Sequence, residues 1–214
     1  MKRPLGIALL ALAALALGAA AGVVTVGHFS AGDLAGWEPK EFKGLTTYSL
    51  VEVDGRKVLK AVSESSASAL IREIEADPAK TPTLSWSWKI EKTLPGGDGR
   101  SKAGDDFAAR VYVVFPSFLF WNTRALNYVW ANKLPVGRTW PNAFAGDNVM
   151  MMAVNSGNGQ AGQWVSHRRD LAADFRRCFG EEPPAIGAIA VMTDSDNTKG
   201  SAVAYYGDIT LSSK

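Results

Sequence analysis

Cysteine is almost absent from this chain of 214 residues, because Cys178 is the only one. A lone cysteine cannot form an intramolecular disulfide, which excludes the disulfide-stapled scaffolds common among small secreted domains. Cys178 lies in the segment FRRCFG, flanked by apolar residues at helical spacing. This setting is typical of a buried, inert thiol rather than a catalytic nucleophile.

Histidine is nearly as scarce, since His28 and His167 are the only two. The chain contains no G-x-S-x-G, S-x-x-K or H-E-x-x-H motif, and no group of His and Cys at the spacing of transition-metal ligands. These absences argue against the common serine-nucleophile and zinc-dependent hydrolases. The basic neighbours of His167 favour a polar residue on a helix surface.

The only long apolar run begins close to the N-terminus. Lys2 and Arg3 precede an unbroken small or apolar stretch, Ile7 to Ala21, which ends in the small-x-small pattern of a signal-peptidase site. The stretch is too short to span a bilayer comfortably. We therefore expect residues 1–21 to be a signal peptide, the mature protein to be periplasmic or secreted, and no stable membrane span after cleavage. A retained N-terminal anchor helix is the alternative.

An excess of either charge is also lacking. The 23 basic residues include Lys2 and Arg3 of the expected signal peptide, and the remaining basic residues equal the 21 acidic ones in number. A mature chain of balanced charge is not expected to bind nucleic acid through its phosphates.

What the sequence does contain is a succession of strand patterns. Asp54-Gly55 separates two β-rich runs, which predicts a hairpin. The segment TLSWSWKIEKT alternates, and its two faces carry Leu84, Trp86, Trp88 and Ile90 on one side, and Ser85, Ser87 and Lys89 on the other. Similar runs recur to the C-terminus.

One amphipathic helix is predicted, roughly over residues 166–179, ended by Gly180 and by the following Pro183-Pro184. The pattern gives about nine or ten strands and no alternation of strands with helices. We therefore predict a mainly β protein, with a single β-sandwich or jelly-roll-like domain over residues 22–214.

Five aspartates and one asparagine gather near the ends of several predicted strands. The group comprises Asp105, Asp106, Asp194, Asp196, Asn197 and Asp208. Oxygen-rich loops of this kind suit a structural calcium ion, so these six residues are candidate calcium ligands. Two of the aspartates are alternatively a glycosidase pair. The third interpretation is a polar hairpin loop whose Asp and Asn side chains cap their own backbone turns.

Aromatic and amide residues suggest a ligand-binding face. Alternation places Tyr128, Trp130 and Asn132 on one face of their strand, and Arg110 and Tyr112 together on another strand. If the two strands are neighbours, these five residues form one mixed polar and aromatic surface, as in a ligand groove. The alternative is that Tyr128 and Trp130 cover the helix or a second sheet.

Several segments are similar to one known family. GDDFAARVYVVF, LNYVWAN, NVMMMAVNSG, the stretch from GQWVSHRRD to MTDSDNT, and AYYGDI together resemble the exported bacterial domain-of-unknown-function family 3047. The strand succession is more distantly similar to the jelly rolls of carbohydrate-binding modules. That likeness implies a β-sandwich that binds glycans on a concave sheet face and often holds a structural calcium.

Three functions follow as hypotheses. The first is a non-catalytic binding domain for a glycan-type or other polar ligand. The second is a carbohydrate-active hydrolase or lyase that uses paired aspartates. The third is a cell-envelope interaction or assembly protein, for which the apolar segment PSFLFWNT, residues 116–123, would be an exposed contact patch.

Overall fold

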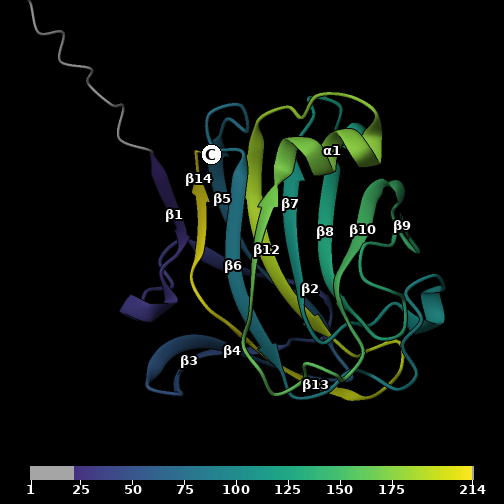
Figure 1. The fold of residues 1–214 in the computed structure, drawn as a ribbon. Helices are drawn as coiled ribbons and strands as arrows, with labels where there is room; N and C mark the ends of the chain where they lie inside the picture. Colours follow the sequence, from purple (N-terminus) through teal and green to yellow (C-terminus); the bar gives the residue numbers. More distant parts are fainter. Residues whose placement is uncertain (1–21, 214) are drawn as a thin grey trace, which may run out of the picture.

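The computed structural model describes residues 22–213 (Figure 1). The expected signal peptide, residues 1–21, lies outside the described residues. The described chain forms two seven-stranded sheets, which we name sheet A and sheet B. Sheet A contains β1 (Val23–Gly27), β14 (Ile209–Ser212), β6 (Thr83–Ile90), β13 (Ser201–Tyr206), β4 (Arg56–Glu64) and β3 (Thr47–Val53), with β11 (Val165–Asp170) paired to β6. Sheet B contains β2 (Trp37–Lys43), β5 (Ala67–Ala76), β12 (Ile186–Asp194), β7 (Arg110–Phe115), β8 (Arg124–Ala131), β10 (Gly146–Ser156) and β9 (Thr139–Asn142).

The predicted fold class is confirmed, because the described chain is mainly β, in two sheets with one α-helix. The number of strands is larger than expected, 14 in the described residues instead of nine or ten. The additional strands are short or irregular. For example, β2 contains Pro39 and four charged residues, and β14 follows β13 so closely that the two look like one strand in the sequence. Three short 3-10 helices, η1 (Phe29–Ala31), η2 (Lys102–Gly104) and η3 (Phe120–Asn122), lie in the connections.

The helix, α1 (Leu171–Phe179), is shorter than predicted. The expected start at Ser166 is wrong, because Val165–Asp170 form β11 and pair with β6. The helix begins where Asp170 accepts a hydrogen bond from the backbone N–H of Ala173, at 3.0 Å, as a typical N-cap. Gly180 ends it in a left-handed conformation, as the sequence predicts. No helix among residues 22–213 has the length and apolar character needed to cross a membrane.

The hairpin between β3 and β4 is confirmed. Asp54 and Gly55 both have positive φ, 54° and 73°. Two successive residues in this conformation give the type I′ turn, whose twist matches that of the flanking strands.

The core between the sheets is built on aromatic side chains. Trp86 and Trp88 of β6 face inward, as alternation predicts, and they meet Tyr128 and Trp130 of β8. The ring centroids of Trp86 and Tyr128 are 5.2 Å apart, and those of Trp88 and Trp130 are 6.1 Å apart. These rings join the two sheets across the centre of the sandwich.

Removing the indole of Trp88 should strongly destabilise the domain. Trp88 is fully buried and its indole N–H donates to Asn155 Oδ1 at 2.8 Å. We expect Trp88→Ala to lower the free energy of unfolding by about 3–5 kcal/mol. The control is Trp121→Ala, at a side chain that is 58% exposed, with an expected change within about 0.5 kcal/mol. Urea unfolding of both variants tests this, and equal losses would contradict the packing described.

Candidate functional site

Sheet A divides at the connection between β13 and β14. Both strands pair with β6, but β13 also pairs with β4, whereas β14 pairs with β1. The two residues between them, Gly207 and Asp208, lie beside Ser87, and the N–H of Gly207 donates to the Ser87 carbonyl at 2.8 Å. A Cβ at position 207 would approach Ser87 Oγ to 2.3 Å, so any larger residue would displace that hydroxyl.

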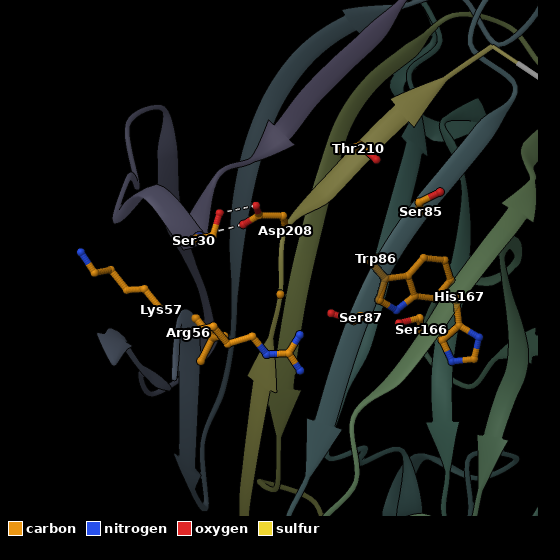
Figure 2. A pocket seen from close by; sticks show the side chains of 12 residues that line it. Ser30, Arg56, Lys57, Ser85, Trp86, Ser87, Ser166, His167, Asp208 and Thr210 are labelled. Atoms are coloured by element: carbon orange, nitrogen blue, oxygen red, sulfur yellow. Dashed lines mark hydrogen bonds between the residues drawn. The ribbon is translucent and has the colours of Figure 1, made fainter. Parts of the chain in front are cut away.

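A groove of about 390 Å³ lies at this division, on the outer face of sheet A (Figure 2). Ser85 and Ser87 of β6 line it. They lie on the outer face of the strand, whereas Trp86 and Trp88 of the same strand face the core. Ser166 and Thr210 pair with Ser87 and Ser85, so their hydroxyls lie on the same face. The remaining lining residues are Ser30, Arg56, Lys57, Val58, Trp86, His167, Gly207 and Asp208.

Two features of the groove are available to a ligand. The hydroxyls of Ser85, Ser87, Ser166 and Thr210 make no hydrogen bond to any other described side chain or backbone group, so they are free to bind one. Arg56 extends into the groove, whereas Lys57 points away from it (Figure 2).

An aromatic and basic surface continues beyond the groove. The Arg56 guanidinium lies over the ring of Trp164, 3.8 Å from its centroid. Register places Tyr205 beside Lys60 and Lys89 on this outer face. Trp164 is oriented by its N–H bond to Asp54, 2.9 Å long. The outer face of sheet A therefore combines hydroxyls, aromatic rings and cations.

His167 forms part of the inner wall of the groove. The interpretation of His167 as a helix-surface residue is wrong, because it lies in β11 and its ring packs on Trp86 at a centroid distance of 4.9 Å. Its Nε2 donates to Asn155 Oδ1 at 2.6 Å. Burial and the positive charge of Arg169 lower the pKa of His167 to about 4. The imidazole is therefore neutral near pH 7 and adds no charge to the groove.

The five residues predicted as a ligand-binding face do not share one face. Strands β7 and β8 are neighbours, as the hypothesis required, but Arg110 lies opposite Val129 and Tyr112 opposite Asn127. Because facing residues of paired strands point to the same side, Tyr128 and Trp130 point to the other side of sheet B. Both are fully buried between the sheets. The single face inferred from the sequence is therefore wrong.

The five side chains instead make structural contacts. The Tyr128 hydroxyl donates to Asp174 of α1 at 2.8 Å, and the Trp130 indole donates to the Gly157 carbonyl at 2.9 Å. Asn132 fixes the loop before β7, because its side chain bonds the Leu94 N–H at 2.9 Å and the Asp106 carbonyl at 2.7 Å. The Tyr112 hydroxyl accepts from Arg110 at 3.2 Å.

The predicted acidic residues converge only in part. Carboxylate oxygens of Asp106, Asp194 and Asp196 lie within 4.8 Å of one another. Asp105 lies close by, 3.7 Å from the Arg110 guanidinium, and accepts from Asn142 at 3.1 Å. Asp208 does not join them; it lies at the groove and accepts from both the backbone N–H (2.8 Å) and the hydroxyl (2.5 Å) of Ser30.

Arg110 occupies the centre of this acidic group. Both oxygens of Asp194 accept from its guanidinium, with an Nε–Oδ1 distance of 2.7 Å, and both side chains are buried. Although burial disfavours the charged guanidinium, Asp194 and its other neighbours raise the pKa of Arg110 well above the usual value. Burial also raises the pKa of Asp105, against the opposing effect of Arg110. Arg110 and Asp194 thus form a buried, hydrogen-bonded ion pair.

Asp106 caps the loop that follows β12. One of its oxygens accepts from the backbone N–H and side chain of Asn197, both at 3.2 Å, and the other accepts from the Thr198 N–H at 2.6 Å. Asp196 is near the surface and pairs with Lys43 at 3.4 Å. The oxygens that a calcium ion would need already accept from N–H groups or pair with cations. These bonds favour the capped-loop interpretation.

The comparisons with known proteins identify a family. Residues 35–210 match the family described as "Protein of unknown function (DUF3047)". The chain belongs to this family. The match confirms the resemblance inferred from the sequence. No curated protein matches the chain.

Solved structures similar to this DUF3047 chain include carbohydrate-binding modules from Clostridium thermocellum. A family 30 module of a cellulosomal cellulase aligns with a TM-score of 0.52 and 10% identity, covering 90% of this chain and 98% of the module. A family 11 module of another cellulosomal cellulase aligns with a TM-score of 0.50 and 12% identity, covering 90% and 95%. At these identities the likeness concerns the fold alone, and it confirms the jelly-roll expectation.

The groove was missed by sequence reasoning, although one signal for it was present. Alternation in β6 assigns Ser85 and Ser87 to the face opposite the tryptophans, which is the correct side. The contributions of Arg56, Trp164 and Thr210 depend on which strands pair with β6 and on the contact of Trp164 with the distant β3–β4 turn. No local pattern encodes those pairings.

We expect the acidic residues around Arg110 to stabilise the fold and not to bind a metal ion. We expect Asp194→Ala, which leaves Arg110 buried without its partner, to lower the free energy of unfolding by about 3–5 kcal/mol. Asp196→Ala, which removes the pair with the exposed Lys43 and one hydrogen bond from Asn197, should cost about 1 kcal/mol. Calcium or EDTA should leave the melting temperature of the unmodified protein unchanged. A rise with calcium that Asp196→Ala abolishes would contradict this assignment.

Proposed function

We propose that this domain binds a glycan, without cleaving it, in the groove on the outer face of sheet A. The observation that carries the proposal is the groove itself. It opens to solvent on one sheet of a jelly roll and is lined by four hydroxyls that lack partners among the described residues. Aromatic and basic side chains adjoin it.

The chemistry of the lining suits a polyhydroxylated ligand. Serine and threonine hydroxyls donate and accept hydrogen bonds, so they match sugar hydroxyls in either role. Trp164 and Tyr205 are half-buried and present aromatic surface beside the groove. The fold shared with carbohydrate-binding modules supports this function as an analogy. Such a role also fits the export that residues 1–21 predict.

Non-catalytic binding is favoured over hydrolysis by the carboxylates. Glycosidases need two of them on either side of the bond that breaks. Among the described residues that line the groove, Asp208 is the only carboxylate, and both of its oxygens accept from Ser30. Asp106 and Asp194 do not line the groove. Their hydrogen bonds hold a loop and a buried arginine instead.

Filling the groove should abolish binding without unfolding the protein. We expect soluble polysaccharides to retard the protein in affinity gel electrophoresis and to be recovered uncleaved. Ser85→Tyr places a ring in the groove and should remove the retardation, with a melting temperature close to that of the unmodified protein. Ser201→Tyr, at an exposed position on β13 of the same sheet, should bind normally. Retention of full binding by Ser85→Tyr would refute the location, and release of reducing sugars would refute non-catalytic binding.

One observation favours a second candidate function, assembly of copies of this chain in the cell envelope. The segment PSFLFWNT lies at the β7–β8 connection, where Phe118 is fully exposed, Phe120 is 78% exposed and Trp121 is 58% exposed. Phe144, at the neighbouring β9–β10 turn, is also exposed. The Trp121 carbonyl accepts from Asn148 of β10 at 2.8 Å, which connects the segment to that hairpin. Adjacent exposed aromatic residues are typical of a contact surface.

Self-association is the test of this second function. Sedimentation velocity at rising concentration should show a larger species for the unmodified protein. Phe118→Ser combined with Phe120→Ser should keep the chain monomeric, because apolar area is removed from the contact. A monomer at every concentration for the unmodified protein would exclude assembly through this segment.

A further inference from the structure

We propose that the ligand of the groove is an acidic saccharide, whose carboxylate or sulfate group is bound by Arg56. This inference rests on the proposed function and specifies the class of glycan. It follows from Arg56, whose guanidinium reaches the groove without a hydrogen-bond or ion-pair partner among the described residues.

Arg56 is the central residue. Its side chain enters the groove, as Figure 2 shows, and it forms no hydrogen bond or ion pair with another described residue. Its guanidinium lies over the ring of Trp164, at 3.8 Å from the ring centroid. Stacking holds the guanidinium plane in place while leaving its N–H groups along the edge of the plane free. This arrangement presents a planar fork of donors, which suits a carboxylate or a sulfate oxygen pair.

Further cations flank Arg56 on the same face. Arg168 lies opposite Ser85 in the β11–β6 register, so it borders the hydroxyl-lined part of the groove. Lys60 lies on the other side, near the ring of Tyr205. Neither forms a hydrogen bond or ion pair with a described residue, and Arg168 is exposed. An anionic polymer would therefore meet cations at more than one point along the face.

Three acidic side chains of this face already have hydrogen-bond partners, whereas Glu64 is exposed at the opposite end of β4 from Arg56. Asp54 accepts from Lys89 at 3.0 Å and from Trp164 at 2.9 Å. Asp208 accepts from Ser30, and Glu91 accepts from the Tyr205 hydroxyl at 3.2 Å. These carboxylates therefore do not neutralise Arg56, Lys60 or Arg168 by direct contact. The bonds from Lys89 and Trp164, and also the nearby charge of Arg56, lower the pKa of Asp54, but the N–H donors of Arg56 are left for a ligand.

The hydroxyls of the groove and the Arg56 guanidinium would bind different parts of the same ligand. Ser85, Ser87, Ser166 and Thr210 lie along β6 and its neighbours, on one side of the Arg56 guanidinium. A sugar ring can place its hydroxyls against these residues while an acidic substituent meets Arg56. Neutral glycans would satisfy only the hydroxyls, so they should bind more weakly than acidic ones.

The experiment compares acidic and neutral polysaccharides on the full mature protein. Isothermal titration calorimetry would use polygalacturonate and alginate as carboxylate probes, dextran sulfate as the sulfate probe, and dextran and a neutral β-glucan as uncharged probes. We expect at least one acidic probe to bind about tenfold or more tightly than the neutral ones, with affinity falling as salt rises to about 0.5 M. Comparison of the carboxylate and sulfate probes then identifies the anion.

Variants separate recognition by Arg56 from general attraction. Arg56→Gln should weaken acidic binding by at least about tenfold, because a charge-assisted hydrogen bond is lost. Arg56→Lys keeps the charge but not the planar fork, and should recover only part of the affinity. The matched control is Arg138→Gln, at an exposed arginine just before β9 of sheet B, which should bind as the unmodified protein does.

The outcomes distinguish this inference from the proposed function. Equal or tighter binding of neutral probes, lost in Ser85→Tyr, would overturn the acidic ligand and leave glycan binding in place. Equal weakening by Arg56→Gln and Arg138→Gln would show attraction by overall charge and would overturn the role of Arg56. Binding of none of the five polysaccharides would overturn both.

Discussion

The alternation of side chains along β6 is the constraint on which most of this structure depends. Its inward residues, Trp86 and Trp88, join the sheets through the aromatic core. Its outward residues, Ser85 and Ser87, form the floor of the candidate site. Because β6 pairs with β11 and β14, the positions of Ser166 and Thr210 in the groove follow from one strand held in place by its own buried face. The aromatic core and the proposed binding site thus lie on opposite faces of the same segment.

Charged residues serve two different purposes in the two sheets. In sheet B, Arg110 and Asp194 are buried together, and Asp106 caps the loop after β12. Each of the two buried charges would be costly to bury without the other. In sheet A, Arg56 lies at the surface and is held by an aromatic ring instead of a carboxylate. A cation that needs no internal partner is one that a ligand can use.

The fold predicted from the sequence agreed with the structure where the signals were local. The turn at Asp54-Gly55, the end of the helix at Gly180 and the inward face of β6 each depend on a few neighbouring residues. The predicted start of the helix at Ser166 is wrong because the sequence around His167 is compatible with either a helix or a strand that is buried on one face and exposed on the other. Pairing with β6, which is distant in the chain, decided for the strand.

By itself, the sequence determined the fold class, the family and the face on which each residue of a regular strand lies, because side-chain alternation is a local property of the backbone. Only the tertiary structure decided which faces meet. The register of β7 against β8 separates Arg110 from Tyr128, and the division of sheet A brings Asp208 to the groove and not to Asp194. Register and strand order arise from contacts between residues far apart in the chain, which no local pattern records.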